Sequence, residues 1–221
     1  MGLDMYLKRS YSKYRKDDGT LSTNWDDCKL DKFGRPNRVT FSEMVGYWRK
    51  ANHIHKWFVD NVQDGEDDCR EYDVSIEQLH ELRNICFDIL SKLHGMEIRV
   101  PKKGVKEFVE ANDKFYGGKS IQRIKIDINN FETISNLTGH HILTKSQIKK
   151  CGCDNVLPTQ DGFFFGSCSY DGWYLQSLVE TIEMLDELFE KHDENDKILA
   201  EDRKNNTQTT TYFDYYYQAS W

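Results

Sequence analysis

Polar and aromatic side chains recur at three- and four-residue steps near position 50: Trp48, Arg49, Asn52, His53, Lys56 and Trp57. Residues at this spacing are neighbours on a helix, so we expect their polar heads to converge on one surface. A guanidinium fork suits phosphate or carboxylate, and Trp57 is placed to stack on a planar ring. The pattern predicts a site for an anionic aromatic ligand. The alternative is a solvated helix face, with His55 as a hydrogen-bonded core histidine.

A second candidate segment lies where a predicted buried strand, 163–166, meets a strongly periodic helix. Its candidate residues are Gly166, Ser167, Tyr170, Asp171 and Tyr174. Backbone N–H groups at a helix start attract anions. Asp171 capping the helix itself is the alternative. We expect this turn and the Trp48–Trp57 helix to form two walls of one pocket.

Other candidate sets lack part of the pattern that their chemistry needs. The acidic turn 64–68 lacks the alternating oxygens and distant Glu of a calcium loop, so we expect it to pair with Lys or Arg. Gly117–Ser120 lacks the earlier glycine of a phosphate loop. The zinc candidates have an unusual Cys-x-Cys gap and stay open: His140, His141, Cys151 and Cys153. We therefore expect no catalytic set, no metal and no cofactor.

Composition excludes several classes of protein. The 221 residues carry 30 Lys and Arg against 37 Asp and Glu, a net charge of −7, which disfavours general nucleic-acid binding. The 5 Trp, 12 Phe and 12 Tyr argue against disorder. No apolar run approaches the roughly 18 residues of a membrane span, and the N-terminus lacks a signal-peptide pattern. We expect a protein of the host cytoplasm with reduced thiols.

The first half of the chain shows clear periodicities. Residues 2–9 alternate as a strand with one buried face, and 10–40 read as a loop or hairpin excursion. A helix is predicted from Ser42 to Val62, and a short extended piece at 72–74. A second helix runs from Ser75, with Gln78 completing a capping box, to about Leu93.

The second half contains a basic stretch, 96–157, which we interpret as an insertion or subdomain with a short helix over 105–115 and a strand over 121–128. The helix after Asp171 is expected to end near 192–196, and the aromatic segment 211–221 to form a strand. Together these elements predict one α+β domain over residues 1–221. A small, mostly antiparallel sheet would pair the N- and C-terminal strands, with three main helices packed on it and an inserted α/β segment.

Four stretches carry a resemblance. They read MGLDMYL at 1–7, YWRKAN with NVQDG and DDC over 47–69, LPTQDGFFFGS with YD over 157–171, and YYQASW at 216–221. Through these stretches, and over about half of its length in all, the chain resembles a family of uncharacterised phage- and prophage-encoded proteins. The resemblance implies a setting of virus–bacterium conflict, in which small accessory proteins counter host defence.

Three functions follow as expectations. The first is a binding protein that sequesters a small nucleotide-type anion, which needs no general base. The second is a small nucleotide hydrolase or transferase with His53 or His55 as acid/base. The third is a protein that binds a host protein and inhibits it. Homo-oligomerisation is left open.

Overall fold

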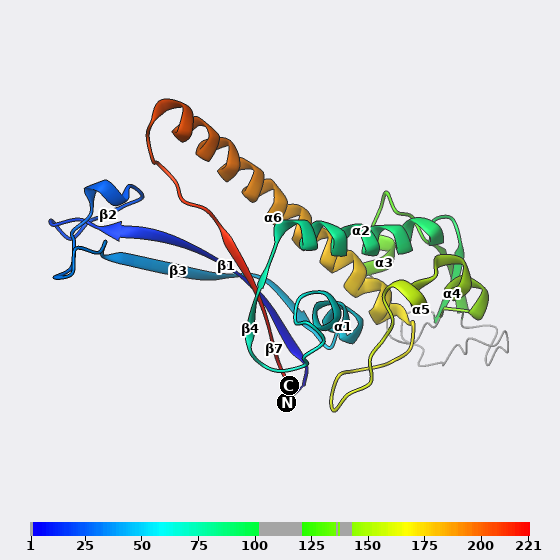
Figure 1. Cartoon of the computed structure of the whole chain (residues 1–221). Coiled ribbons are helices and arrows are strands. Elements are labelled where there is room, and N and C mark those ends of the chain that lie inside the picture. The colour runs from blue at the N-terminus through cyan, green and yellow to red at the C-terminus, as the bar shows by residue number, and fades with distance from the viewer. Residues whose placement is uncertain (1, 102–120, 136, 138–142) are drawn as a thin grey trace.

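The fold is centred on an antiparallel sheet whose long strand is the first. A computed structural model describes residues 2–101, 121–135, 137 and 143–221 (Figure 1). Strand β1 (Asp4–Arg15) pairs with β3 (Arg38–Arg49) along one side. On its other side it pairs with β7 (Asp214–Ser220) near the base and β2 (Leu21–Ser22) near the far end. Strand β4 (Glu71–Val74) follows β7. The predicted pairing of the terminal strands is confirmed.

The alternating residues of the first strand bury one face. Leu3, Met5 and Leu7 are fully buried, as their period of two predicts. The strand continues past Arg9, and with β3 it forms a long hairpin through the predicted excursion. A short 3₁₀ helix, η1 (Trp25–Asp27), lies in the connection.

The predicted helix from Ser42 to Val62 is wrong in its first half. Residues 38–49 form β3, and only α1 (Asn52–Asn61) is helical. Positions four apart share a face in a strand as well as on a helix, so Met44 and Trp48 did not discriminate between the two. A bulge at Val45 then separates them, since Met44 pairs with Lys8 but Gly46 pairs with Leu7. Met44 is accordingly exposed, whereas Trp48 is buried.

The main helices pack against the sheet and against each other (Figure 1). Helix α2 (Ile76–Leu93) begins with the predicted Ser75–Gln78 capping box and lies along α6 (Gly172–Asn205). Helix α6 begins at Asp171 as predicted but runs well past residues 192–196. Leu199 and Asp202 are buried there, and the Asp202 carboxylate accepts hydrogen bonds from Thr207 and Thr209. These contacts extend the helix beyond its acidic segment.

The 96–157 segment shares the main hydrophobic cluster. Strands β5 (Glu97–Pro101) and β6 (Ile121–Lys125) pair antiparallel, followed by α3 (Glu132–Ser135), α4 (Lys145–Cys151) and α5 (Cys153–Val156). Ile98, Ile134 and Leu157 join the buried cluster. The predicted helix at 105–115 and the Gly117–Ser120 motif lie outside the described residues. Within the described parts of the chain, no helix is both long and apolar enough to cross a membrane.

The predicted buried strand at 163–166 is wrong. These residues form a turn in which Phe163 is 83% exposed and Phe164 is 53% exposed, and only Phe165 is buried. A run of apolar residues therefore predicted burial that the turn does not provide. The turn leads into α6 and borders the cavity described next.

Candidate functional site

A cavity of about 620 Å³ lies between the β3–α1 junction and the first turns of α6. Among its lining residues are Tyr47, Arg49, Lys50 and His53 on one side and Gly166, Ser167, Asp171, Trp173, Tyr174, Ser177 and Glu180 on the other. This size lies within the range of ligand pockets, roughly 300–1,000 Å³. The two segments that the sequence singled out therefore face each other across a hollow.

Six of the predicted site residues line this cavity: Arg49, His53, Gly166, Ser167, Asp171 and Tyr174. The others do not line it: Trp48, Asn52, Lys56, Trp57 and Tyr170. The predicted convergence of polar heads on one helix face is wrong, because Arg49 belongs to β3 and not to the helix.

The residues outside the cavity have other partners. Trp48 is buried and donates its indole N–H to Thr181 Oγ1 at 2.8 Å. Trp57 is 4% exposed and packs its edge on Phe58, so it has no free face for stacking. Lys56 pairs with Asp60 at 2.8 Å. Neither side chain is therefore placed for the stacking or cationic role predicted for it.

Asn52 links α1 to the 160–167 turn by hydrogen bonds. It is 1% exposed, and its Nδ2 donates to the carbonyl oxygens of Phe165 (3.3 Å) and Ser167 (2.9 Å). Its Oδ1 accepts from the backbone N–H of Gln160 at 3.2 Å. One buried amide thus satisfies backbone groups at both ends of the 160–167 turn, so Asn52 is a positioning residue.

His53 is held neutral at the cavity floor. Ser177 donates its hydroxyl to the Tyr174 carbonyl, so the imidazole Nε2–H, 2.8 Å away, donates to Ser177 Oγ. The ring also lies 4.2 Å from the Tyr174 ring. Burial lowers the pKa of His53 to about 3. The side chain therefore carries no charge near neutral pH.

The helix start on the opposite wall is already occupied by a carboxylate. Asp171 is 4% exposed and accepts hydrogen bonds from the N–H groups of Trp173 and Tyr174. Burial raises its pKa. The alternative interpretation, in which Asp171 caps the helix, is confirmed. An anion would therefore be held by Arg49 and Lys50 rather than by these N–H groups.

Two cavity residues, Lys50 and Gly166, and the nearby Phe164 have left-handed backbone conformations. Lys50 has φ 56°, Phe164 φ 64° and Gly166 φ 98°. A Cβ on Gly166 would lie 3.0 Å from both the Cβ and the carbonyl oxygen of Lys50. Such conformations are costly and persist where the surrounding packing enforces them.

We expect Gly166→Ala to lower the free energy of unfolding by about 1–3 kcal/mol, because it adds a steric clash to an unfavourable φ. Gly65→Ala is the matched control, since Gly65 has φ 83° but open space around its Cβ position. Urea unfolding of both variants measures the difference. Equal losses would contradict a close contact between Gly166 and Lys50.

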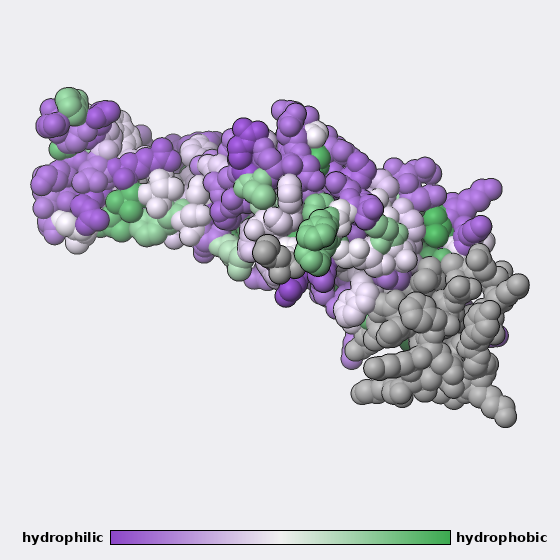
Figure 2. Space-filling view, turned by 90° about the horizontal axis from the view of Figure 1, so that it is seen from below, coloured by the Kyte–Doolittle hydropathy of each residue, from purple (hydrophilic) through white to green (hydrophobic). Residues whose placement is uncertain are grey.

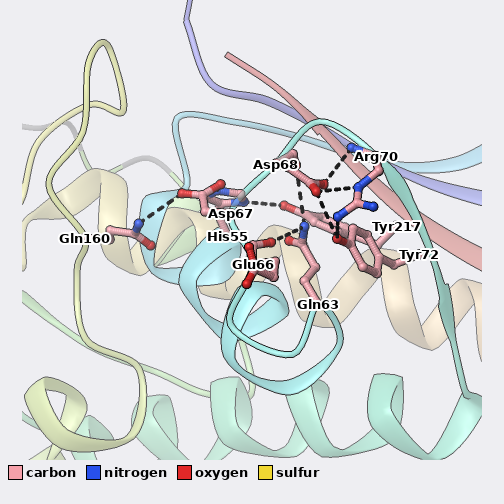
Figure 3. Close-up of polar contacts among 9 residues, drawn as sticks. All are labelled: His55, Gln63, Glu66, Asp67, Asp68, Arg70, Tyr72, Gln160 and Tyr217. Carbon is pink, nitrogen blue, oxygen red and sulfur yellow. Dashed lines mark hydrogen bonds and ion pairs between the residues drawn. The ribbon is translucent and has the colours of Figure 1, made fainter.

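A buried network lies beside the cavity (Figure 3). His55 is fully buried, with Nε2 2.9 Å from Asp67 and Nδ1 2.7 Å from the Tyr217 hydroxyl. A carboxylate only accepts, so Nε2 carries the proton and Nδ1 accepts from Tyr217. Gln160 Nε2 also reaches Asp67, at 3.3 Å. His55 is thus the hydrogen-bonded core histidine of the alternative interpretation.

The acidic turn serves local structure. Asp68 pairs with Arg70, and Gln63 donates to the backbone carbonyl of Glu66, as Figure 3 shows. The pairing of this turn with a basic residue is confirmed. Among the described residues, no group of three or more His, Cys, Asp and Glu could hold a metal ion. His140 and His141, half of the zinc candidate, lie outside the described residues.

Sequence reasoning missed eight cavity residues, among them Tyr47, Lys50, Trp173 and Glu180. Tyr47 alternates with buried Trp48 along β3, and a strand assignment would have placed it on the outer face. Trp173 and Glu180 lie seven residues apart on α6, a spacing that places both on one side of a helix. No local signal marked Lys50, whose position depends on the turn into α1.

Comparisons with known proteins find no matching family, no matching curated protein and no matching solved structure.

Proposed function

We propose that the chain binds a small anionic, nucleotide-type ligand in the 620 Å³ cavity and sequesters it without turnover. The observation that carries the proposal is the arrangement of unlike groups around one hollow. Arg49 and Lys50 supply positive charge at the rim, and Trp173 and Tyr47 supply aromatic surface. Glu180 supplies an acceptor for the N–H groups of a base. Phosphate, ring and exocyclic amine are the parts of a nucleotide that these groups recognise.

The cationic rim is available to a ligand. The Arg49 side chain is 63% exposed, and among the described residues its ion pair is with Asp4, at 3.9 Å. An exposed pair at this distance contributes little, so a phosphate competes for the guanidinium at small cost. A bidentate Arg–phosphate contact is also short and directional. Arg49 is the residue on which we expect affinity to depend most.

The aromatic surface is partly exposed to solvent. Trp173 is 59% exposed and Tyr47 is 46% exposed, although both line the cavity. Stacking of a base on an aromatic ring is worth about 1–3 kcal/mol. A planar ligand would cover apolar surface that the chain alone leaves in water, which favours a ring-bearing anion over inorganic phosphate.

The two histidines favour sequestration over catalysis. His53 has a pKa of about 3, far below the value near working pH that suits a general acid or base. His55 is fully buried, and both of its ring nitrogens have partners within the protein. The hydrolase or transferase hypothesis relied on one of these side chains, so their environments support binding instead.

Hydrogen bonds join the stretches that carry the phage resemblance: Asn52 to Gln160, His55 to Tyr217, and the Leu3 N–H to the Phe164 carbonyl. Two of these stretches, 47–69 and 157–171, supply residues that line the cavity. This convergence supports a shared site and, with it, a counter-defence role in which the protein withdraws a nucleotide signal in an infected cell.

Isothermal titration against mono-, di- and cyclic nucleotides tests the proposal. We expect binding of at least one nucleotide, weakened tenfold or more by Arg49→Ala, with the ligand recovered unchanged by chromatography. Arg70→Ala is the matched control, because Arg70 is also exposed but pairs with Asp68 outside the cavity. Absence of heat with every nucleotide, or equal affinity of wild type and Arg49→Ala, would refute the proposal. Recovery of a converted nucleotide would support the enzyme hypothesis.

A further inference from the structure

The β1–β3 hairpin extends beyond the rest of the sheet as an arm. Strand β7 leaves β1 at Ser10, whereas β1 and β3 remain paired to Tyr14 and Arg38. We call residues 11–41 the arm. Figure 1 shows it projecting from the body on the side away from α4, and in Figure 2 its visible face is hydrophilic over much of its area, with hydrophobic residues along one edge. Within the chain, the Thr23 hydroxyl of the arm donates to the Gln208 carbonyl and the Tyr11 ring contacts the Phe213 ring.

The arm has a charge opposite in sign to that of the body. It carries seven Lys and Arg and five Asp, a net charge of +2, whereas the remaining residues carry −9. Some of its acidic groups are engaged internally: Asp31 pairs with Arg35, and Asp27 with Lys16. Among the described residues, Lys29 and Lys32 have no carboxylate within ion-pair distance. The whole-chain charge of −7 therefore conceals a locally basic projection.

The apex of the arm combines cations with an exposed ring. The turn closes between Leu30 and Pro36, and Phe33 at its outer end is 67% exposed. The Lys32 ammonium lies 4.9 Å from the centre of the Phe33 ring, and the Arg35 guanidinium 5.0 Å from it. Trp25 in η1 is a second exposed ring, at 53%. The apex thus presents to solvent an exposed apolar ring with two cations close to it.

These features favour a duplex nucleic acid over a protein surface. A β-ribbon fits the width of a DNA groove, and proteins that enter grooves insert apolar side chains between base steps while cations contact the phosphates. The central contact of a protein–protein interface is instead depleted in charge. Between apex and body the arm carries further basic residues, Lys13, Arg15 and Arg38. Its two larger rings there, Tyr11 and Phe41, stack on each other.

We propose that the arm docks into a groove of double-stranded nucleic acid, with Lys29, Lys32 and Arg35 on phosphates and Phe33 against the base steps. The inference stands apart from the proposed ligand cavity, because Arg49 and the arm apex lie at opposite ends of β3. The net charge of the whole chain disfavours nucleic-acid binding, whereas the local charge of the arm favours it.

Fluorescence polarisation with a labelled 20-base-pair DNA duplex tests this proposal. At 50 mM salt we expect micromolar binding, with a slope of log affinity against log salt of about −3 if three phosphates are neutralised. The Lys32→Glu and Arg35→Glu double variant should lose affinity tenfold or more. Phe33→Ala should weaken binding and leave the salt slope unchanged, because a ring releases no counterion.

The matched control reverses two exposed lysines on α4, Lys149→Glu with Lys150→Glu, which alters net charge by the same amount. We expect this variant to bind like wild type. A larger loss in the control than in the arm variant, or no binding at 50 mM salt, would overturn the proposal. Binding of heparin with the same affinity as the DNA duplex would also overturn it. So would a wild-type dimer in size-exclusion chromatography that the arm variant, but not the control, converts to a monomer. Circular dichroism spectra confirm that each variant is folded.

Discussion

Replacement of Asn52 by leucine is expected to lower the free energy of unfolding by about 3 kcal/mol or more and to abolish ligand binding in the cavity. Leucine has a similar shape but leaves the Gln160 N–H and the carbonyls of Phe165 and Ser167 without their present partner. Each buried polar group left unsatisfied costs about 1–3 kcal/mol. The 160–167 turn would then separate from α1, and one wall of the cavity would be displaced.

Urea unfolding and titration with the best nucleotide measure the two effects. Asn61→Leu is the matched control, because Asn61 is on the same helix but exposed, with its Nδ2 on the Trp57 carbonyl within that helix. We expect a loss below about 1 kcal/mol for the control and unchanged affinity. If both variants lose the same stability, the Asn52 amide does not hold the turn.

His53 is expected to make the fold sensitive to acid. Its pKa is about 3 in the folded protein against 6.5 as the ordinary value, so the unfolded chain binds the proton more readily. The stability that neutral His53 contributes is fully present above pH 6.5 and is lost as pH falls from 6.5 toward 3. At pH 4.5 this amounts to about 3 kcal/mol, from two pH units at 1.36 kcal/mol each.

The measurement compares the free energy of unfolding at pH 7.5 and pH 4.5 for wild type and His53→Gln. Wild type should lose about 3 kcal/mol more than the variant between these conditions, because glutamine keeps a donor for Ser177 but does not titrate. His55 and the carboxylates contribute to both proteins and cancel in the difference. Parallel curves for wild type and His53→Gln would show that the imidazole is not excluded from water.

Much of the fold could be predicted because its signals are local. The alternation around Leu3 and Met5, the Ser75–Gln78 capping box and the Asp171 cap each specify an element within a few residues. The strand identity of 38–49 could not be predicted in this way. It depends on pairing with β1, and its residues at four-residue steps fit a helix equally well.

The sequence predicted which two segments line the cavity better than it predicted what their side chains do. The roles of individual residues were assigned from residue type alone. Asn52 and Trp57 were expected to contact a ligand, yet the first binds backbone and the second is buried. Those roles depend on the 160–167 turn and on the left-handed Lys50, neither of which any local pattern specifies. Tertiary contacts decide which side chains remain free.

The place of β7 within the sheet has a consequence for biosynthesis. This strand lies between β1 and β4, and it joins Asp4 to Ser220, residues more than 200 positions apart. During translation, β1 and β4 leave the ribosome long before the strand that separates them. Such distant pairing slows folding, since the closure of a long loop precedes the gain from contact. The nascent chain would therefore carry an open sheet with unpaired edges for most of its synthesis, a state that chaperones recognise.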